Sequence, residues 1–224
     1  MAVSTEHDTA APGTETTDET ATTGTGRRFG LGWLLGTLAF GLVVGLAAGL
    51  LVPRLQTPGD DSPEAGFLRD MSTHHSQAVA MSMIAHANSQ DPAIVTLAGD
   101  IGLTQQAQIA YMQSWLRDWN LSPTGSQEPM AWMPGSAGSV VNGLMPGMAT
   151  PDQMAKLREA TGRDLDIQFL TLMRAHHLGG IHMDEGVLDL STEDDVTWLA
   201  KGQIAAQQSE ISRIDDLLKQ LQTT

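Results

Sequence analysis

The strongest constraint on the fold is a pattern that the chain contains twice. Residues 67–85 read FLRDMSTHHSQAVAMSMIA, and residues 169–188 read FLTLMRAHHLGGIHMDEGVL. The Phe, Leu, Met and paired His residues of the first stretch recur in the second at a constant separation of 102 residues. The agreement continues downstream, where the segment that starts at Leu97 matches the segment that starts at Leu199. Repetition of such a unit predicts two similar halves that share one core.

Hydrophobic periodicity predicts that each half is a pair of helices. The apolar and His positions recur at steps of three and four residues, which places them on one face of a helix. Asp91 and Thr150 precede Pro residues and are expected to cap helices, and Ser191 is expected to start the last helix. The expected helices cover residues 63–88, 91–120, 151–160, 163–190 and 191–222. With residues 121–162 as a long crossover, residues 63–222 are predicted to form an all-α four-helix bundle.

The N-terminal part predicts a membrane segment. Residues 1–28 are rich in Thr, Ala, Gly and acids, which favours a disordered cytoplasmic tail. Residues 29–52 carry no charge and are long enough to span a bilayer as one transmembrane helix, a signal anchor. More Arg before than after this span favours a cytoplasmic N-terminus, and residues 53–62 are expected to be a linker. The alternative is a cleaved signal peptide. Both interpretations place the bundle outside the cytoplasm, on the cell membrane or secreted.

The amino-acid composition limits which partners and which kinds of site the chain can have. The net charge of −14 argues against nucleic acid as a partner, because a phosphate backbone would be repelled. The chain has no Cys, which excludes disulfides, thiolate metal sites and thiol catalysis. Seven His and twelve Met leave imidazole and thioether as the soft or borderline metal ligands.

The repeated His pairs are the main candidates for a site. Both pairs lie on the core faces of their predicted helices, with Met residues one or two turns away. The bundle would bring together four imidazoles and four thioethers: His74, His75, His176, His177, Met71, Met81, Met173 and Met183. This ligand set matches copper best, as Cu(I) or Cu(II), and zinc is also compatible with the imidazoles. The alternative is a core in which Met fills space and each His makes structural hydrogen bonds.

Further candidates surround this set. Gln108 and Glu210 are expected to face the His level, where each would accept a hydrogen bond from an imidazole and fix its tautomer. His86 shares a helix face with His75, three turns away. In the crossover, Met145 and Met148 have a spacing compatible with soft-metal ligands, although they could equally pack onto the bundle.

Several classes of enzyme site have no matching pattern in the sequence. A di-iron carboxylate site needs several inward Glu and Glu-x-x-His motifs, which the chain lacks. It also has no Ser–His–Asp order, phosphate loop or dinucleotide fingerprint. Binding is therefore favoured over catalysis.

The motifs MSTHHSQAVAM, LMPGM and FLTLMRAHHLGGIHM, with the Gln-x-x-Glu at Gln207 and Glu210, resemble the ferritin-like bacterial family catalogued as domain of unknown function 305. The similarity covers roughly residues 62–222. It implies a secreted or membrane-anchored helical bundle, and some members bind copper in the periplasm. Matched by position, this resemblance implies that the same eight His and Met residues are the metal ligands. Gln108 stands where a second Glu is expected, and His86 and His182 are additional to the pattern.

The sequence as a whole predicts a membrane-anchored extracytoplasmic copper-binding protein that sequesters or hands over the ion. One alternative is a metal-dependent oxidoreductase that oxidises Cu(I). Another is an interaction module that binds no metal. A homodimer and a copper-handling partner protein are both compatible with the sequence.

Overall fold

The structure, a computed structural model, describes residues 30–136 and 138–223 and divides into two compact units, residues 1–55 and 56–224. The predicted cytoplasmic tail, residues 1–28, lies outside the described residues. Helix α1 (Leu31–Gln56) belongs to the first unit, and its stretch Leu31–Leu50 is long and apolar enough to cross a membrane. A signal sequence near the N-terminus would pass the same test. The helix runs to Gln56 rather than ending at residue 52, so it includes part of the predicted linker.

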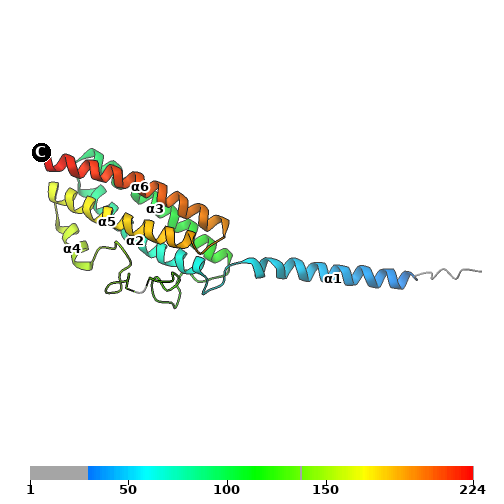
Figure 1. Cartoon of the computed structure of the whole chain (residues 1–224). Helices are drawn as coiled ribbons and strands as arrows, with labels where there is room; N and C mark the ends of the chain where they lie inside the picture. Colours follow the sequence, from blue (N-terminus) through cyan, green and yellow to red (C-terminus); the bar gives the residue numbers. More distant parts are fainter. Residues whose placement is uncertain (1–29, 137, 224) are drawn as a thin grey trace, which may run out of the picture. The chain divides into compact units, whose positions relative to one another are not determined.

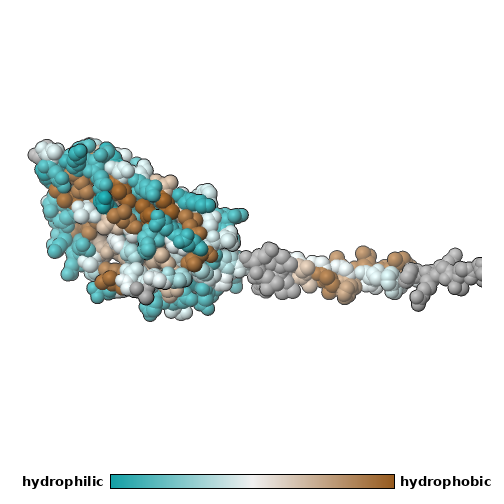
Figure 2. All heavy atoms as spheres, in the orientation of Figure 1, coloured by the Kyte–Doolittle hydropathy of each residue, from teal (hydrophilic) through white to brown (hydrophobic). Residues whose placement is uncertain are grey.

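The apolar side chains of residues 31–50 in α1 are exposed. Leu38, Phe40 and Leu42 are each more than 70% exposed, and Figure 2 shows hydrophobic side chains along this helix. An all-round apolar helix of this kind needs an apolar environment. This property fits both a membrane anchor and a signal sequence.

The second unit is a four-helix bundle, as predicted, with one short additional helix (Figure 1). Its helices are α2 (Pro63–Asn88), α3 (Pro92–Asp118), α4 (Pro151–Glu159), α5 (Gly162–Leu188) and α6 (Asp194–Thr223). Helix α2 packs on α3, and α5 packs on α6, so each hairpin is a unit. The two hairpins meet mainly through α2 and α5, whereas α3 and α6 barely touch.

Local side chains set the helix ends. Helix α2 starts where the Ser62 hydroxyl accepts a hydrogen bond from the Ala65 N–H, and Asp91 caps α3 in a similar way. The predicted end of α3 at Asn120 was two residues too long, because Asn120 has a left-handed backbone with φ of 59°. Helix α6 begins at Asp194 rather than Ser191, because the Ser191 hydroxyl accepts the Glu193 N–H in a turn that precedes the helix.

The cap of α4 supports a quantitative expectation. The Thr150 side chain accepts the Gln153 N–H, and the Gln153 side chain accepts the Thr150 N–H, forming a complete capping box. Replacing Thr150 with Ala should lower the free energy of unfolding by about 1 kcal/mol. Urea unfolding checks this value, with Thr104→Ala at an exposed position of α3 as the control. A loss no larger than that of the control would contradict the role of the cap.

Two apolar clusters fill the bundle. One contains Ala78, Ile101 and Phe169, and the other contains Phe67, Met112 and Val187. The paired His residues of α2 and α5 belong to neither cluster. They form a buried polar layer in the middle of the two central helices.

Candidate metal centre

The four paired His residues lie together at the contact between α2 and α5. All four side chains have no solvent exposure. The rings of His74 and His176 are in contact, with centroids 3.7 Å apart and planes tilted by 34° to each other. The rings of His75 and His177 lie further out, at 6.5 Å from His74 and 6.4 Å from His176 respectively. The sequence therefore placed both pairs on the core face correctly.

The Nε2 atom of each ring contacts an oxygen acceptor. His75 contacts Gln108 Oε1 at 2.8 Å, and His177 contacts Glu210 Oε2 at 2.6 Å. These two contacts confirm the predicted hydrogen bonds, and each spans 33 residues of sequence. His74 contacts the Pro146 carbonyl at 3.0 Å, and His176 contacts the His74 carbonyl at 2.9 Å. Carbonyl and carboxylate oxygens only accept, so the Nε2 atoms that face them carry the proton.

One contact bears on the tautomer of His75. The Nε2 atom of Gln203 also lies 3.0 Å from His75 Nε2. One ring nitrogen cannot donate to Gln108 and accept from Gln203 at the same time. Rotating the Gln203 amide by half a turn would bring its unpartnered Oε1 toward the same N–H. We therefore assign the proton to Nε2 in His75, as in the other three rings.

This arrangement leaves four lone pairs in the core. Within the described part of the chain, the Nδ1 atoms of all four rings are buried and have no hydrogen-bond partner. A buried polar atom without a partner is costly, so four at matched positions point to a ligand rather than to structural stabilisation. A lone pair on Nδ1, with Nε2–H held by an oxygen, is also the state in which imidazole binds a metal ion.

Burial keeps the rings of His74, His75 and His176 neutral. Desolvation lowers the pKa of His74 to about 4 and the pKa of His75 to about 3, because it disfavours the imidazolium. Desolvation, with the neighbouring His74, lowers the pKa of His176 well below its ordinary value. Protons therefore do not compete for these nitrogens at neutral pH.

The four predicted thioether ligands lie on both sides of this His layer. Met71 and Met183 belong to one apolar cluster, and Met81 and Met173 belong to the other. All four have no solvent exposure. Among residues 30–136 and 138–223, no three His, Asp or Glu side chains converge on a point that would hold a metal ion. The available donor set is therefore imidazole with flanking thioether.

The crossover covers one side of the His layer. The Pro146 carbonyl accepts from His74, and Gln77 holds the same loop by exchanging hydrogen bonds of 2.9 and 2.6 Å with the backbone of Ala149. The loop lies so close to α5 that a Cβ on Gly179 would be 1.9 Å from the Pro146 oxygen. In the sequence, the Pro-Gly of LMPGM and the Gly pair of α5 are the features that could have indicated this close approach. Within this loop, Met145 is buried and Met148 is half-buried.

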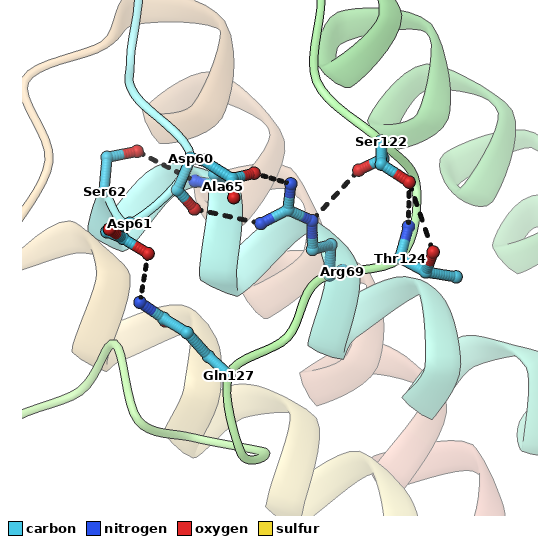
Figure 3. Close-up of polar contacts among 8 residues, drawn as sticks. All are labelled: Asp60, Asp61, Ser62, Ala65, Arg69, Ser122, Thr124 and Gln127. Atoms are coloured by element: carbon cyan, nitrogen blue, oxygen red, sulfur yellow. Dashed lines mark hydrogen bonds and ion pairs between the residues drawn. The ribbon is translucent and has the colours of Figure 1, made fainter.

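Two neighbouring residues of α2 anchor the rest of the crossover. The Asp70 carboxylate accepts from the Met130 N–H at 2.6 Å and from the Trp132 indole at 2.8 Å. The buried Arg69 donates to the Ser122 carbonyl and to both the carbonyl and the carboxylate of Asp60, as Figure 3 shows. These contacts tie the start of the crossover to the segment before α2.

The structure separates the two additional His residues from this centre. His86 is exposed in the last turn of α2, where its Nδ1 contacts the Val95 carbonyl at 3.0 Å. His182 is exposed on α5. Neither lies with the four buried rings.

The fold and motifs lead to a family. Residues 64–218 match the family described as Domain of unknown function (DUF305). The chain belongs to this family. A DUF305 protein from Streptomyces coelicolor, described as a candidate secreted protein, is 41% identical with a TM-score of 0.67, covering 73% of this chain and 96% of its own.

Two further solved structures share the fold. A DUF305 fragment from Deinococcus radiodurans is 28% identical with a TM-score of 0.59, covering 70% of this chain and 96% of its own. CopM in its Cu(I)-bound form is 19% identical with a TM-score of 0.55, covering 71% and 96%. No curated protein matches the chain.

Proposed function

We propose that this DUF305 protein is a membrane-anchored extracytoplasmic protein that holds copper in its bundle core, for sequestration or handover. The observation that carries the proposal is the set of four buried Nδ1 atoms without hydrogen-bond partners. These imidazoles and the flanking thioethers form a donor set that selects copper among the common metals, since thioether favours Cu(I) and imidazole serves both oxidation states.

The protein–metal contacts of this proposal fall on named residues. His74, His75, His176 and His177 would supply nitrogen ligands, and Met71, Met81, Met173 and Met183 would supply sulfur. Gln108 and Glu210 would orient His75 and His177 through the hydrogen bonds already described. CopM, which has the same fold, is known in Cu(I)-, Cu(II)- and silver-bound forms, which supports copper as the ion.

The proposed location rests on α1 and on a relative. Helix α1 has the length and composition of a membrane span. The relative from Streptomyces coelicolor is described as a candidate secreted protein. Retention of α1 would anchor the bundle on the outer side of the membrane, and its cleavage would release it.

Thermal unfolding of the full chain in detergent micelles tests the copper site. Copper at about 100 times its dissociation constant should stabilise the fold by about 2.7 kcal/mol and raise the melting temperature measurably. The titration is run with Cu(I) under reductant, Cu(II) and Zn(II). The copper effect should disappear in His74→Ala/His176→Ala. Because that variant also removes the donors to two buried carbonyls, Met71→Leu/Met173→Leu, which conserves side-chain volume, provides a second test.

The outcomes distinguish the functional classes. A copper-dependent rise that weakens in both double variants supports copper storage or transfer. Stabilisation by zinc alone would mean that the site binds metal but not copper. No stabilisation by any of the ions would contradict the proposal. Oxygen uptake on addition of Cu(I) would instead identify an oxidase.

A further inference from the structure

A second group of soft donors lies on the outer face of the first hairpin, away from the His layer. A hollow of about 400 Å³ lies between α2 and α3 and is lined by Met83, His86, Gly99 and Leu103, among others. Met83 is 61% exposed and Leu103 is 76% exposed. Met83 and His86 therefore face solvent rather than the core.

The imidazole of His86 is held in a defined orientation. Its Nδ1 lies 3.0 Å from the Val95 carbonyl, and because a carbonyl only accepts, Nδ1 carries the proton. The ring lies flat enough on α3 that a Cβ on Gly99 would be 3.2 Å from Nδ1. In the neutral ring the lone pair is therefore on Nε2, which is the opposite tautomer to that of the four core His residues.

Met83 lies one turn before His86 on the same helix face. Residues three apart on a helix have Cβ atoms about 5–6 Å apart, within reach of a shared ion. Both side chains line the same hollow. A thioether and an imidazole thus line the same surface hollow, at a position where no core packing explains the exposed Met.

We propose that Met83 and His86 form a surface site for a soft monovalent cation, Cu(I) or Ag(I). Such ions accept few ligands and prefer thioether and imidazole donors. The net charge of −14 raises the local concentration of cations at the surface. The site is separate from the core site, because both residues are exposed whereas the four rings of the His layer are fully buried. The second hairpin has Glu185 and Leu188 at the corresponding positions, so it lacks this pair.

A different role for His86 needs to be separated from metal binding. His86 lies in the last turn of α2, where an imidazolium would interact favourably with the negative end of the helix dipole. That role does not involve Met83. Responses of the Met83 methyl group therefore distinguish the two roles.

The test is a silver titration of the full chain in detergent micelles, with ¹³C-methyl-labelled Met observed by NMR. The Met83 resonance is identified by its absence in Met83→Leu. We expect it to shift and saturate with silver, to stop responding in His86→Ala, and to respond normally in His182→Ala. His182 is a matched control because it is exposed and has no Met three or four residues away. Bound silver should fall by one equivalent in Met83→Leu and in His86→Ala.

Three results would overturn the proposal: a Met83 resonance that does not move, one that still moves in His86→Ala, or an equal loss in His182→Ala. The same titration reports on the core site and the surface site separately, because each has its own Met methyl resonances. Shifts of the Met71 and Met173 methyl groups without Met83 would support only the core site. Shifts of Met83 alone would support only the surface site.

Discussion

Lowering the pH of the metal-free protein from 7 to 4.5 is expected to remove much of its stability. Three buried imidazoles, those of His74, His75 and His176, have their pKa lowered in the folded state, chiefly by desolvation. The unfolded chain takes up protons on these rings below about pH 6.5. In the native protein His74 does so only at about pH 4 and His75 at about pH 3. Stability is therefore fully present above pH 6.5 and falls as the pH drops through this window.

The magnitude follows from proton linkage. Between its pKa in the folded state and its pKa in the unfolded state, each such ring changes the free energy of unfolding by up to about 1.4 kcal/mol per pH unit. His74 and His75 together would lower the free energy of unfolding by on the order of 4–6 kcal/mol at pH 4.5, relative to pH 7. The total stability of a typical protein is about 5–15 kcal/mol. Asp184 acts in the opposite direction, because burial raises its pKa and folding then becomes more favourable as the pH falls. Burial also raises the pKa of Asp70 and of Glu193, but these two carboxyls are only half-buried. The three fully buried rings should therefore dominate, and the free energy of unfolding should still fall as the pH falls.

Urea unfolding of the metal-free full chain between pH 7 and pH 4.5 measures this slope. The variant Asp184→Asn removes the opposing group and should make the loss of stability on acidification steeper. The variant His182→Ala removes an exposed ring and is the control for the general effect of a His substitution on α5. A stability that stays constant or rises between pH 6.5 and pH 4.5 would show that the buried rings do not titrate as their burial implies.

Gly179→Ala is expected to destabilise the bundle by about 1–3 kcal/mol and to release the crossover loop from the His layer. The added Cβ would lie 1.9 Å from the Pro146 oxygen and 2.9 Å from the Gly147 nitrogen, both backbone atoms. A backbone neighbour cannot rotate away, so the loop has to move. That movement would also break the contact between His74 Nε2 and the Pro146 carbonyl.

The matched control is Gly202→Ala in α6. A Cβ at this helical position meets nothing within 4 Å. Ala is favoured over Gly in a helix by about 0.5–1 kcal/mol, so this variant should be more stable than the wild type. Urea unfolding gives the free energy of unfolding of each variant, and limited proteolysis reports whether the crossover loop is released. Equal stabilisation by both substitutions would mean that the loop does not lie against α5.

The helices were predictable because their signals are local. Steps of three and four residues defined the helix faces, and Pro after Asp91 or Thr150 marked starting points that the structure confirms. Where the expected ends were wrong, a neighbouring backbone conformation decided the end, as at Asn120. The Gln108 and Glu210 contacts were also predictable, because an antiparallel helix pair with a short turn fixes which residues face each other.

The position of His86 shows the limit of helical periodicity. Eleven residues bring His86 to nearly the same direction as His75, and the sequence therefore grouped them. The same eleven residues also separate them by roughly 16 Å along the helix. At that end of α2 the core is closed by Ala85, and His86 is left at the surface. The direction in which a side chain leaves the helix follows from the sequence alone. Its depth of burial depends on which residues pack at that level of the bundle.

The sequence by itself determined that two hairpins bury two His pairs in one core, because periodicity and repetition are properties of the chain. The tertiary structure alone decided which nitrogen of each ring remains available. That choice depends on oxygen acceptors from distant segments: the Pro146 carbonyl of the crossover, the His74 carbonyl of the other hairpin, and the side chains of α3 and α6. A hydrogen-bond partner 72 or 102 residues away is fixed only when the helices pack.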